Sequence, residues 1–227
     1  MPTSVNKTLQ FTATSSSGEV SAILTKPNKP VALLVLAHGA GAGMKHPFME
    51  RIAALFAEEN IATLRFNFPY MEKGKKVPDV PAVAMKTVQS AVEKATQLGE
   101  NLPVFGGGKS FGGRMTSQAA ASGMIDSVKG IIFFGFPLHA PGKNSNERAA
   151  HLYDVKIPML FLQGTRDSLA DISLMRELCN NLGKKTTLHE VEGGDHSFHV
   201  PKQQGNDEDV LKNICKVSSD WMKRIVA

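Results

Sequence analysis

Continuous apolar segments alternate with amphipathic segments along most of the chain. Residues 31–37 read VALLVLA without a polar interruption, which is typical of a strand buried on both faces of a sheet. Residues 47–60 follow, and there Ile52 and Phe56 recur at helical spacing. Because strands that alternate with helices form parallel sheets, this order predicts an α/β fold with a mostly parallel central sheet and helices on both faces.

The same patterns assign the other elements. An alternating pair of segments at 8–14 and 19–27 predicts a hairpin that adds antiparallel strands at one edge of the sheet. No linker, repeat or low-complexity segment divides the sequence, so residues 1–227 are expected to form one domain. Further strands are predicted at 62–69, 103–107, 128–137, 157–167 and 185–194, and further helices at 81–99, 111–123, 146–155, 171–183 and 207–226.

Composition argues against several classes of function. The formal net charge of +5 is scattered, and the densest basic run, residues 73–76, lacks the interleaved aromatic residues of a nucleic-acid interface. The longest apolar run spans about seven residues, whereas a membrane-spanning helix needs roughly 18. The N-terminus lacks the apolar core of a signal peptide, and the two cysteines belong to no metal-binding cluster. We therefore expect a cytoplasmic protein with no nucleic-acid partner, no membrane contact, no metal and no organic cofactor.

The segment VFGGGKSFGGRM, residues 104–115, places five glycines around a single serine. Gly108, Ser110 and Gly112 form the G-x-S-x-G pattern of a nucleophile elbow between a predicted strand and a predicted helix. The glycines let two backbones pass closely, and the sharp turn holds the hydroxyl above the sheet at a helix N-terminus. A phosphate-binding loop is the alternative, but Pro103 stands where that motif requires its first glycine. The pattern therefore indicates a nucleophilic serine.

A serine nucleophile needs a base, and the base needs an acid that orients it. In a sheet with a nucleophile elbow, the acid follows the serine along the chain and the histidine comes last. Asp167 closes the segment LQGTRD at the end of a predicted strand, and it is the predicted acid. Asp171 competes for this role, but its position just before a predicted helix is that of an N-cap.

The predicted base is His196. It follows Gly193 and Gly194 in a loop directly after the last predicted strand, so it shares one rim of the sheet with the serine and the acid. His199 lies three residues further on and is a rival, whereas His189 lies inside the strand itself.

Two backbone N–H groups are needed to hold the oxyanion of an acyl-transfer reaction. Phe111 follows the nucleophile directly and is predicted to supply one of them. Ala40, in the loop after the first buried strand, is predicted to supply the other, with a flexible turn as the alternative for this loop. Its neighbours His38, Gly39 and Gly41 are expected to contact the substrate.

Other substrate contacts are expected beside these loops. The segment FPLHAP follows a strand at the same rim, so Phe136, Leu138 and His139 are predicted to line an acyl pocket. A structural turn fixed by the two prolines is the alternative. Lys109 is a further predicted substrate contact. We hypothesise that one or more of four cations at the rim favour an anionic substrate. The alternative is that these cations form surface salt bridges. The four are Lys45, Lys109, Arg114 and Arg166.

These motifs resemble the α/β-hydrolase superfamily. HGAGAGM, LRFNFP, GGGKSFGGRM, FFGFPLHAPGK, LQGTRD and GGDHSF occur in the superfamily's order across nearly the whole chain, which is most similar to the small dienelactone-hydrolase-like branch. HGAGAGM, GKSFGGRM and FPLHAPGK also resemble a family that includes bacterial hydrolase-like proteins, testis-expressed proteins and a subunit of a histone-acetyltransferase complex. The resemblance implies Ser110, Asp167 and His196 as the catalytic triad, and it implies that some relatives serve as interaction modules.

Two departures from the superfamily refine this expectation. Dienelactone hydrolases use a cysteine nucleophile, whereas this chain has Ser110, so their substrate is not expected here. Many members insert a lid domain after the strand that follows the nucleophile helix. Only FPLHAPGKNSNERAAHLYD separates the strands at that point, so we expect no lid and an open, shallow site.

Together these residues predict a serine hydrolase that cleaves an ester, thioester or related acyl bond of a small molecule through an acyl-enzyme. A non-catalytic α/β-hydrolase-like binding or interaction protein is the alternative, and the complete set of triad residues argues against it. A peptidase is a third reading, but such enzymes usually carry a capping domain for which this chain has no room.

Overall fold

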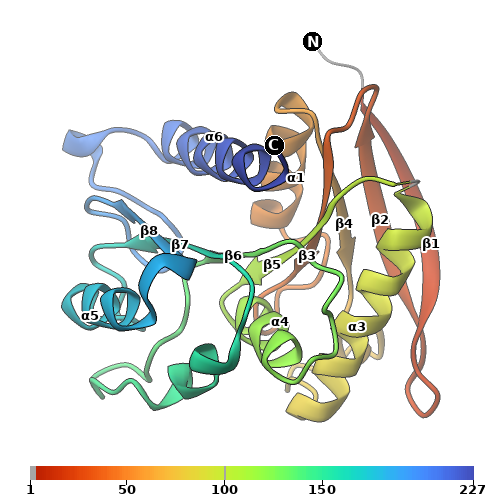
Figure 1. Ribbon diagram of the computed structural model, residues 1–227, viewed down its shortest axis with the longest axis horizontal. Coiled ribbons are helices and arrows are strands. Elements are labelled where there is room, and N and C mark those ends of the chain that lie inside the picture. The colour runs from red at the N-terminus through yellow and green to blue at the C-terminus, as the bar shows by residue number, and fades with distance from the viewer. Residues whose placement is uncertain (1–3, 100) are drawn as a thin grey trace.

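The computed structural model describes residues 4–99 and 101–227, and its centre is a twisted eight-stranded sheet (Figure 1). The strands lie side by side in the order β1-β2-β4-β3-β5-β6-β7-β8. Their bounds are β1 Ser4–Thr14, β2 Gly18–Pro27, β3 Ala32–Ala37, β4 Ile61–Phe66, β5 Val104–Lys109, β6 Ile131–Phe134, β7 Met159–Gly164 and β8 Thr186–Val191.

The sheet is parallel from β4 to β8 and antiparallel at one edge. Strands β1 and β2 form the predicted hairpin, and β2 pairs antiparallel with β4 in a register that places Leu24 opposite Leu64. Strand β3 pairs in parallel with β4 on one side and β5 on the other. After β3 the chain forms β4 on one side of it and later β5 on its other side, so the strand order reverses at β3. In sheets of this kind ligands bind at the carboxyl ends of the strands beside the point of reversal.

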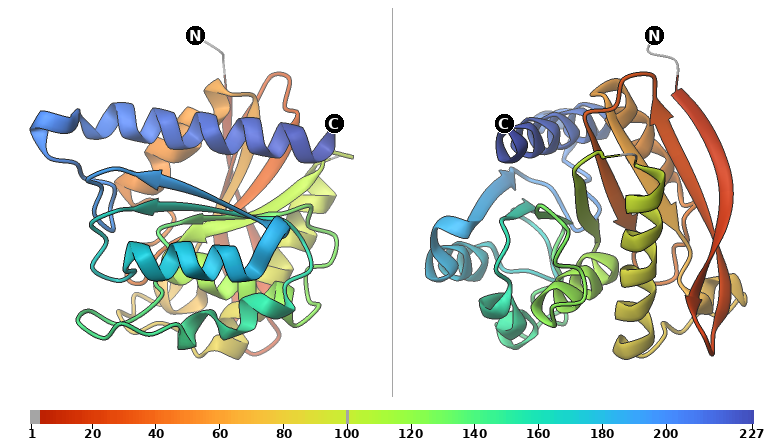
Figure 2. Two further views of the ribbon diagram at one scale, coloured as in Figure 1. Left: turned by 60° about the vertical axis from the view of Figure 1, so that its left-hand side comes forward. Right: turned by 45° about the vertical axis from the view of Figure 1, so that its right-hand side comes forward.

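Helices cover both faces of the sheet, as predicted (Figure 1; Figure 2). Helices α1 and α6 lie on one face, and α6 crosses the strands along most of its length (Figure 2). Helices α3, α4 and α5 lie on the other face (Figure 1). The bounds are α1 Pro47–Glu58, α2 Pro69–Glu72, α3 Pro81–Leu98, α4 Phe111–Ala121, α5 Ile172–Leu182 and α6 Asp207–Val226.

The apolar pattern of the sequence becomes a core on each face. Strands β3, β4 and β7 are buried at every residue, and for β3 this confirms the interpretation of its continuous apolar run. On the face of α1 and α6, Phe56 packs edge-on against Phe134 with ring centroids 6.2 Å apart, and Trp221 of α6 lies over Phe105. Within residues 4–99 and 101–227, no helix combines the length and apolarity needed to cross a membrane.

The connection between β6 and β7 confirms that the fold has no lid domain. It contains one short helical segment, Glu147–Asp154, within the described chain. This segment is a 3₁₀ helix, whereas the sequence pattern predicted an ordinary short helix at 146–155. The carboxyl ends of the parallel strands are therefore not covered by an inserted domain from this connection.

The packing of α1 on the sheet gives a test of the core. We expect Phe56→Ala to lower the free energy of unfolding by about 3–5 kcal/mol, because this side chain is fully buried and its loss leaves a cavity. Val77 is 78% exposed, so Val77→Ala should change the same quantity by less than about 0.5 kcal/mol. Urea unfolding followed by circular dichroism measures both, and equal effects would contradict the packing described.

Candidate active site

Ser110 occupies a strained turn between β5 and α4. Its backbone has φ 50° and ψ −111°, a conformation that costs a non-glycine residue about 1–3 kcal/mol. The glycines around it allow the turn to pack closely against neighbouring backbone. A Cβ at Gly112 would lie 2.5 Å from the carbonyl oxygen of Ala37, and a Cβ at Gly108 would lie 2.6 Å from the Gly112 carbonyl carbon. The backbone of β3 thus presses directly against the elbow, and only glycine fits at these two positions.

Asp167 lies in the loop after β7 and is buried. Its Oδ2 accepts hydrogen bonds from Nδ1–H of His196 at 2.7 Å and from the Gln163 amide at 2.6 Å. Its Oδ1 accepts from the Leu169 backbone N–H at 2.8 Å. These donors satisfy a buried carboxylate that would otherwise be costly. The structure therefore joins Asp167 and His196 directly, as the sequence predicted.

Gln163 is a supporting residue that sequence reasoning missed. It is fully buried at the end of β7, and its Oε1 accepts the Phe136 N–H at 2.9 Å while its amide holds Asp167. The available signal was a polar residue within an otherwise apolar strand. Both of its polar groups are used, so it fixes the loop after β6 to the carboxylate.

His196 lies in a loop that Asp195 organises. The Asp195 carboxylate accepts the N–H groups of Ser197 at 2.7 Å and His199 at 3.0 Å. Because Nδ1 of His196 donates to Asp167, its Nε2 is the atom left to accept a proton.

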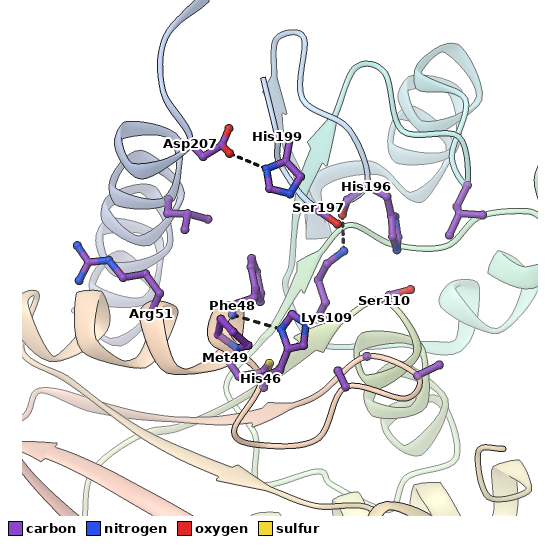
Figure 3. Close-up of a pocket in the computed structure, with 16 residues that line it drawn as sticks. His46, Phe48, Met49, Arg51, Lys109, Ser110, His196, Ser197, His199 and Asp207 are labelled. Carbon is purple, nitrogen blue, oxygen red and sulfur yellow. Dashed lines mark hydrogen bonds and ion pairs between the residues drawn. The ribbon is translucent and has the colours of Figure 1, made fainter. Parts of the chain in front are cut away.

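Ser110 and His196 line the same cavity (Figure 3). Across residues 4–99 and 101–227, no hydrogen bond joins the Ser110 hydroxyl to His196. Rotation about the serine Cα–Cβ bond moves the hydroxyl without moving the backbone, and catalytic hydrogen bonds often tighten only in the substrate complex. The three predicted triad residues thus lie at the ends of three strands, around one site.

The rivals for the triad have other roles. Asp171 caps α5, since its carboxylate accepts the N–H groups of Ser173 and Leu174 at 2.9 and 3.1 Å. Nδ1 of His199 bonds Asp207 at the start of α6, and this contact raises the pKa of His199. His189 contacts Asn213 from within β8. None of these contacts joins the rivals to Ser110.

The two amides predicted for the oxyanion belong to Phe111, which follows the serine in the chain, and to Ala40, which lines the same cavity as the serine. Phe111 opens α4, so its N–H has no acceptor within the helix. Ala40 is exposed and lines the cavity. In the described part of the chain no acceptor bonds the N–H of either residue, so both are available to a ligand.

Of the predicted substrate contacts in the loop after β3, only Gly39 lines the cavity. His38 is fully buried, where Nδ1–H donates to the Gly39 carbonyl at 2.7 Å and Nε2 accepts the Phe68 N–H at 3.2 Å. Burial lowers the pKa of His38 to about 4, so the ring is neutral. The Gly41 N–H donates to the Tyr70 hydroxyl. His38 and Gly41 therefore stabilise the conformation of the loop through these hydrogen bonds and do not line the cavity.

The predicted acyl-pocket residues after β6 also lie elsewhere. Phe136 and Leu138 are buried in the core beneath α5 and the 3₁₀ helix. His139 donates through Nδ1 to Ala140 and accepts the Asp171 N–H through Nε2 at 2.8 Å. The structure corrects this expectation: FPLHAP is a structural turn, because both nitrogens of its histidine and both apolar side chains are committed to the fold.

The cavity beside Ser110 has a volume of about 700 Å³, a size typical of small-molecule sites (Figure 3). Its walls come from the loop after β3, the start of α1, the elbow, the loops after β7 and β8, and the start of α6. The apolar wall residues include Phe48, Met49, Leu169 and Leu211, which the sequence analysis did not predict as substrate contacts.

Of the four rim cations, Lys109 alone lines this cavity. Its ammonium donates to the backbone carbonyl of His196 (Figure 3). Its Nζ lies 5.5 Å from the Phe198 ring centroid and 6.0 Å from that of Phe48. Burial lowers the pKa of Lys109 to about 8, partly opposed by the charges of Asp167 and Asp195. The cavity wall therefore holds a cation that is poorly solvated.

The fold and this site define a class of protein. Residues 30–223 match the family model described as an alpha/beta hydrolase domain, and the chain belongs to this family. The match covers the strands that carry Ser110, Asp167 and His196.

Solved structures of similar fold include lidless hydrolases. A dienelactone hydrolase from Anabaena variabilis superposes with a TM-score of 0.77 and 19% identity over 97% of this chain and 98% of that one. A lidless α/β serine hydrolase from Xanthomonas campestris superposes with a TM-score of 0.74 and 18% identity over 97% of this chain and 96% of that one. At such identity the likeness shows the fold alone.

The curated relatives are longer proteins. Two proteins of Mycobacterium tuberculosis, from strains CDC 1551 and H37Rv, are 28% identical over 207 residues, which is 89% of this chain and 43% of each relative. Both carry the name "Putative phosphoribosyl transferase". The chain thus spans less than half the length of the relatives it matches, and the name describes those whole proteins.

The elbow gives a second stability test. We expect Gly112→Ala to lower the free energy of unfolding by about 3 kcal/mol or more, since backbone atoms of β3 cannot yield to a Cβ. Gly142 has a positive φ of 70° but open space around it, so Gly142→Ala should cost only about 1–2 kcal/mol. Denaturant unfolding of both variants checks the difference, and a smaller loss for Gly112→Ala would contradict the close approach.

The buried charge of Lys109 gives a pH-dependent test. Its folded pKa of about 8 lies below the ordinary value of 10.5, so its protonated form opposes folding. Between these values the unfolded chain holds the proton that the folded chain has released, and this group then adds stability as the pH rises. We expect Lys109→Met to be more stable than the native chain below pH 8, with the difference shrinking toward pH 10.5. Urea unfolding at several pH values measures it, and a less stable variant at pH 7 would contradict the desolvation.

Proposed function

We propose that this protein is a serine hydrolase that cleaves a carboxylic ester or thioester of a small molecule. One observation carries the proposal: His196 is hydrogen-bonded to the buried Asp167 and lines the same cavity as Ser110, which stands on a nucleophile elbow. A base oriented by a carboxylate beside a strained serine is the arrangement that activates a hydroxyl for acyl transfer.

The reaction begins with His196 Nε2 taking the proton of the Ser110 hydroxyl as Oγ attacks the carbonyl carbon of the substrate. The oxyanion that forms is held by the N–H groups of Phe111 and Ala40, at the positive end of α4. His196 returns the proton to the leaving alcohol or thiol, which departs and leaves an acyl-enzyme. Water, deprotonated by His196, then releases the acid and restores Ser110.

Asp167 keeps the imidazole in the required tautomer throughout. Its bond to Nδ1–H leaves Nε2 as the proton acceptor, and its charge stabilises the imidazolium that forms in each step. Gln163 and the Leu169 N–H hold the carboxylate in place. Neither a metal nor an organic cofactor is required for this sequence of steps.

The alternative is a binding protein that retains the hydrolase fold without catalysis. Strain at Ser110 argues against it, because a ligand-binding loop has no need of a serine with a positive φ. The cavity volume and its apolar wall support a small acyl substrate over a polypeptide.

A fluorophosphonate probe tests the activated serine directly. We expect the native protein to be labelled, and Ser110→Ala and His196→Ala to lose labelling. Asp167→Asn should retain a folded structure and label about 10³–10⁴-fold more slowly, because the imidazole then adopts the wrong tautomer.

Matched controls separate the site from the rest of the surface. Ser122 is exposed at the end of α4 and His189 contacts Asn213 in β8, so Ser122→Ala and His189→Ala should label at the native rate. A folded native protein that resists labelling would refute the proposed hydrolase and favour the binding protein.

A further inference from the structure

Lys109 is a cation whose position the proposed acyl-transfer steps do not explain. The other charged groups in the cavity wall have partners of opposite charge: Arg51 binds Glu208, and His199 binds Asp207. Within the described chain, Lys109 forms no ion pair with a carboxylate. Its ammonium contacts the His196 carbonyl and the rings of Phe48 and Phe198.

The ammonium of Lys109 retains hydrogen-bonding capacity toward the cavity. An ammonium has three N–H donors, and one of them is used on the His196 carbonyl. The side chain lines the cavity next to Ser110 (Figure 3). Gly135 leaves room for it, since a Cβ there would lie 3.0 Å from Nζ. The remaining donors are thus free to bind an acceptor inside the site.

A desolvated charge without a counterion opposes folding, and a ligand that supplies the counterion relieves that cost. The charges of Asp167 and Asp195 offset this cost in part, but neither carboxylate forms an ion pair with Lys109 in the described chain. Asp167 is engaged by His196 and Gln163, and Asp195 is engaged by the N–H groups of its own loop. His46, also in the cavity wall, caps α1 by accepting the Phe48 N–H.

We propose that Lys109 is a specificity residue that binds an anionic group of the substrate, so that this hydrolase prefers acyl compounds that carry a carboxylate. The inference rests on the proposed serine hydrolase and adds the class of substrate. Lys109 and Ser110 line the same cavity, so a short acyl compound can place its carboxylate at Lys109 and its carbonyl at Ser110. The carboxylate is bound but not consumed, and the bonds made and broken are those of the acyl transfer above.

The test compares charged and neutral substrates of matched shape. Mono-p-nitrophenyl glutarate and adipate carry the carboxylate, and their methyl esters are the neutral counterparts. Rates measured with Ser110→Ala are subtracted, because the free carboxylate also promotes spontaneous hydrolysis. We expect kcat/KM of the native protein to favour the anionic ester by about ten- to a hundredfold, the worth of a charge-assisted hydrogen bond in a desolvated site.

Variants of Lys109 test whether this residue causes the preference for the anionic ester. Lys109→Met removes the charge and should lower the ratio of anionic to neutral kcat/KM by the same factor. Lys109→Arg keeps the charge and should retain part of the preference. Lys109→Gln serves as a second uncharged variant should the methionine disturb the fold. Lys76 is exposed in the connection between α2 and α3, so Lys76→Met changes the same charge outside the cavity and should leave the ratio unchanged.

The outcomes are distinguishable. A native protein that reacts with the fluorophosphonate probe but shows no preference for the anionic esters overturns this proposal and leaves the hydrolase standing. Equal losses on both substrates in Lys109→Met also overturn it, because Lys109 would then act through the His196 loop. A native protein that does not react with the probe refutes the hydrolase, and the substrate proposal falls with it. A ratio that collapses in Lys109→Met and recovers in Lys109→Arg supports the proposal.

Discussion

The close approach of the elbow to β3 is the constraint on which the site depends. The turn at Ser110 packs so tightly against the end of β3 that neither Gly108 nor Gly112 has space for a Cβ. This contact fixes the start of α4, and with it the Phe111 N–H. It also fixes the end of β3, from which the loop carrying Ala40 departs. The nucleophile and both predicted oxyanion donors are therefore positioned by one backbone contact rather than by separate side chains.

A second close approach brings the acid and the base together. Gly164 ends β7, and a Cβ there would lie 2.3 Å from the Gly194 carbonyl oxygen in the loop after β8. The Arg166 N–H also bonds that carbonyl at 2.9 Å. The two loops are thus joined through their backbones just before Asp167 and His196, so their side chains meet at hydrogen-bonding distance.

The site contains features that lower the free energy of unfolding, and the rest of the fold must compensate for them. It holds a serine with a positive φ, a buried carboxylate and a poorly solvated lysine. The serine and the lysine lower the stability of the fold, whereas the carboxylate is compensated by its three hydrogen-bond donors. Strain and desolvation of this kind cluster where function requires them, and extensive burial of the central strands supplies the stability that tolerates them.

Much of this architecture was readable from the sequence. The alternation of apolar and amphipathic segments determined the order of strands and helices, since period and burial are local properties of a segment. The elbow, Asp167 and His196 were found because each follows a strand, and parallel strands bring their carboxyl ends to one rim. Whether these three residues form a working triad stays a prediction, although the geometry of the acid and the base agrees with it.

Only the tertiary structure decided which neighbours of the triad face the cavity. His38 and His139 have the same residue type and strand-end position as a binding residue, but their rings are held by the Phe68 and Asp171 amides, which lie 30 and 32 residues away in the chain. Phe136 and Leu138 were drawn into the core because α5 and the 3₁₀ helix cover them. Lys109 became a cavity cation because Phe48 and Phe198 enclose it. The sequence by itself determined the fold and the strand ends that carry the chemistry. The direction of each remaining side chain depended on contacts between distant segments, which no local pattern records.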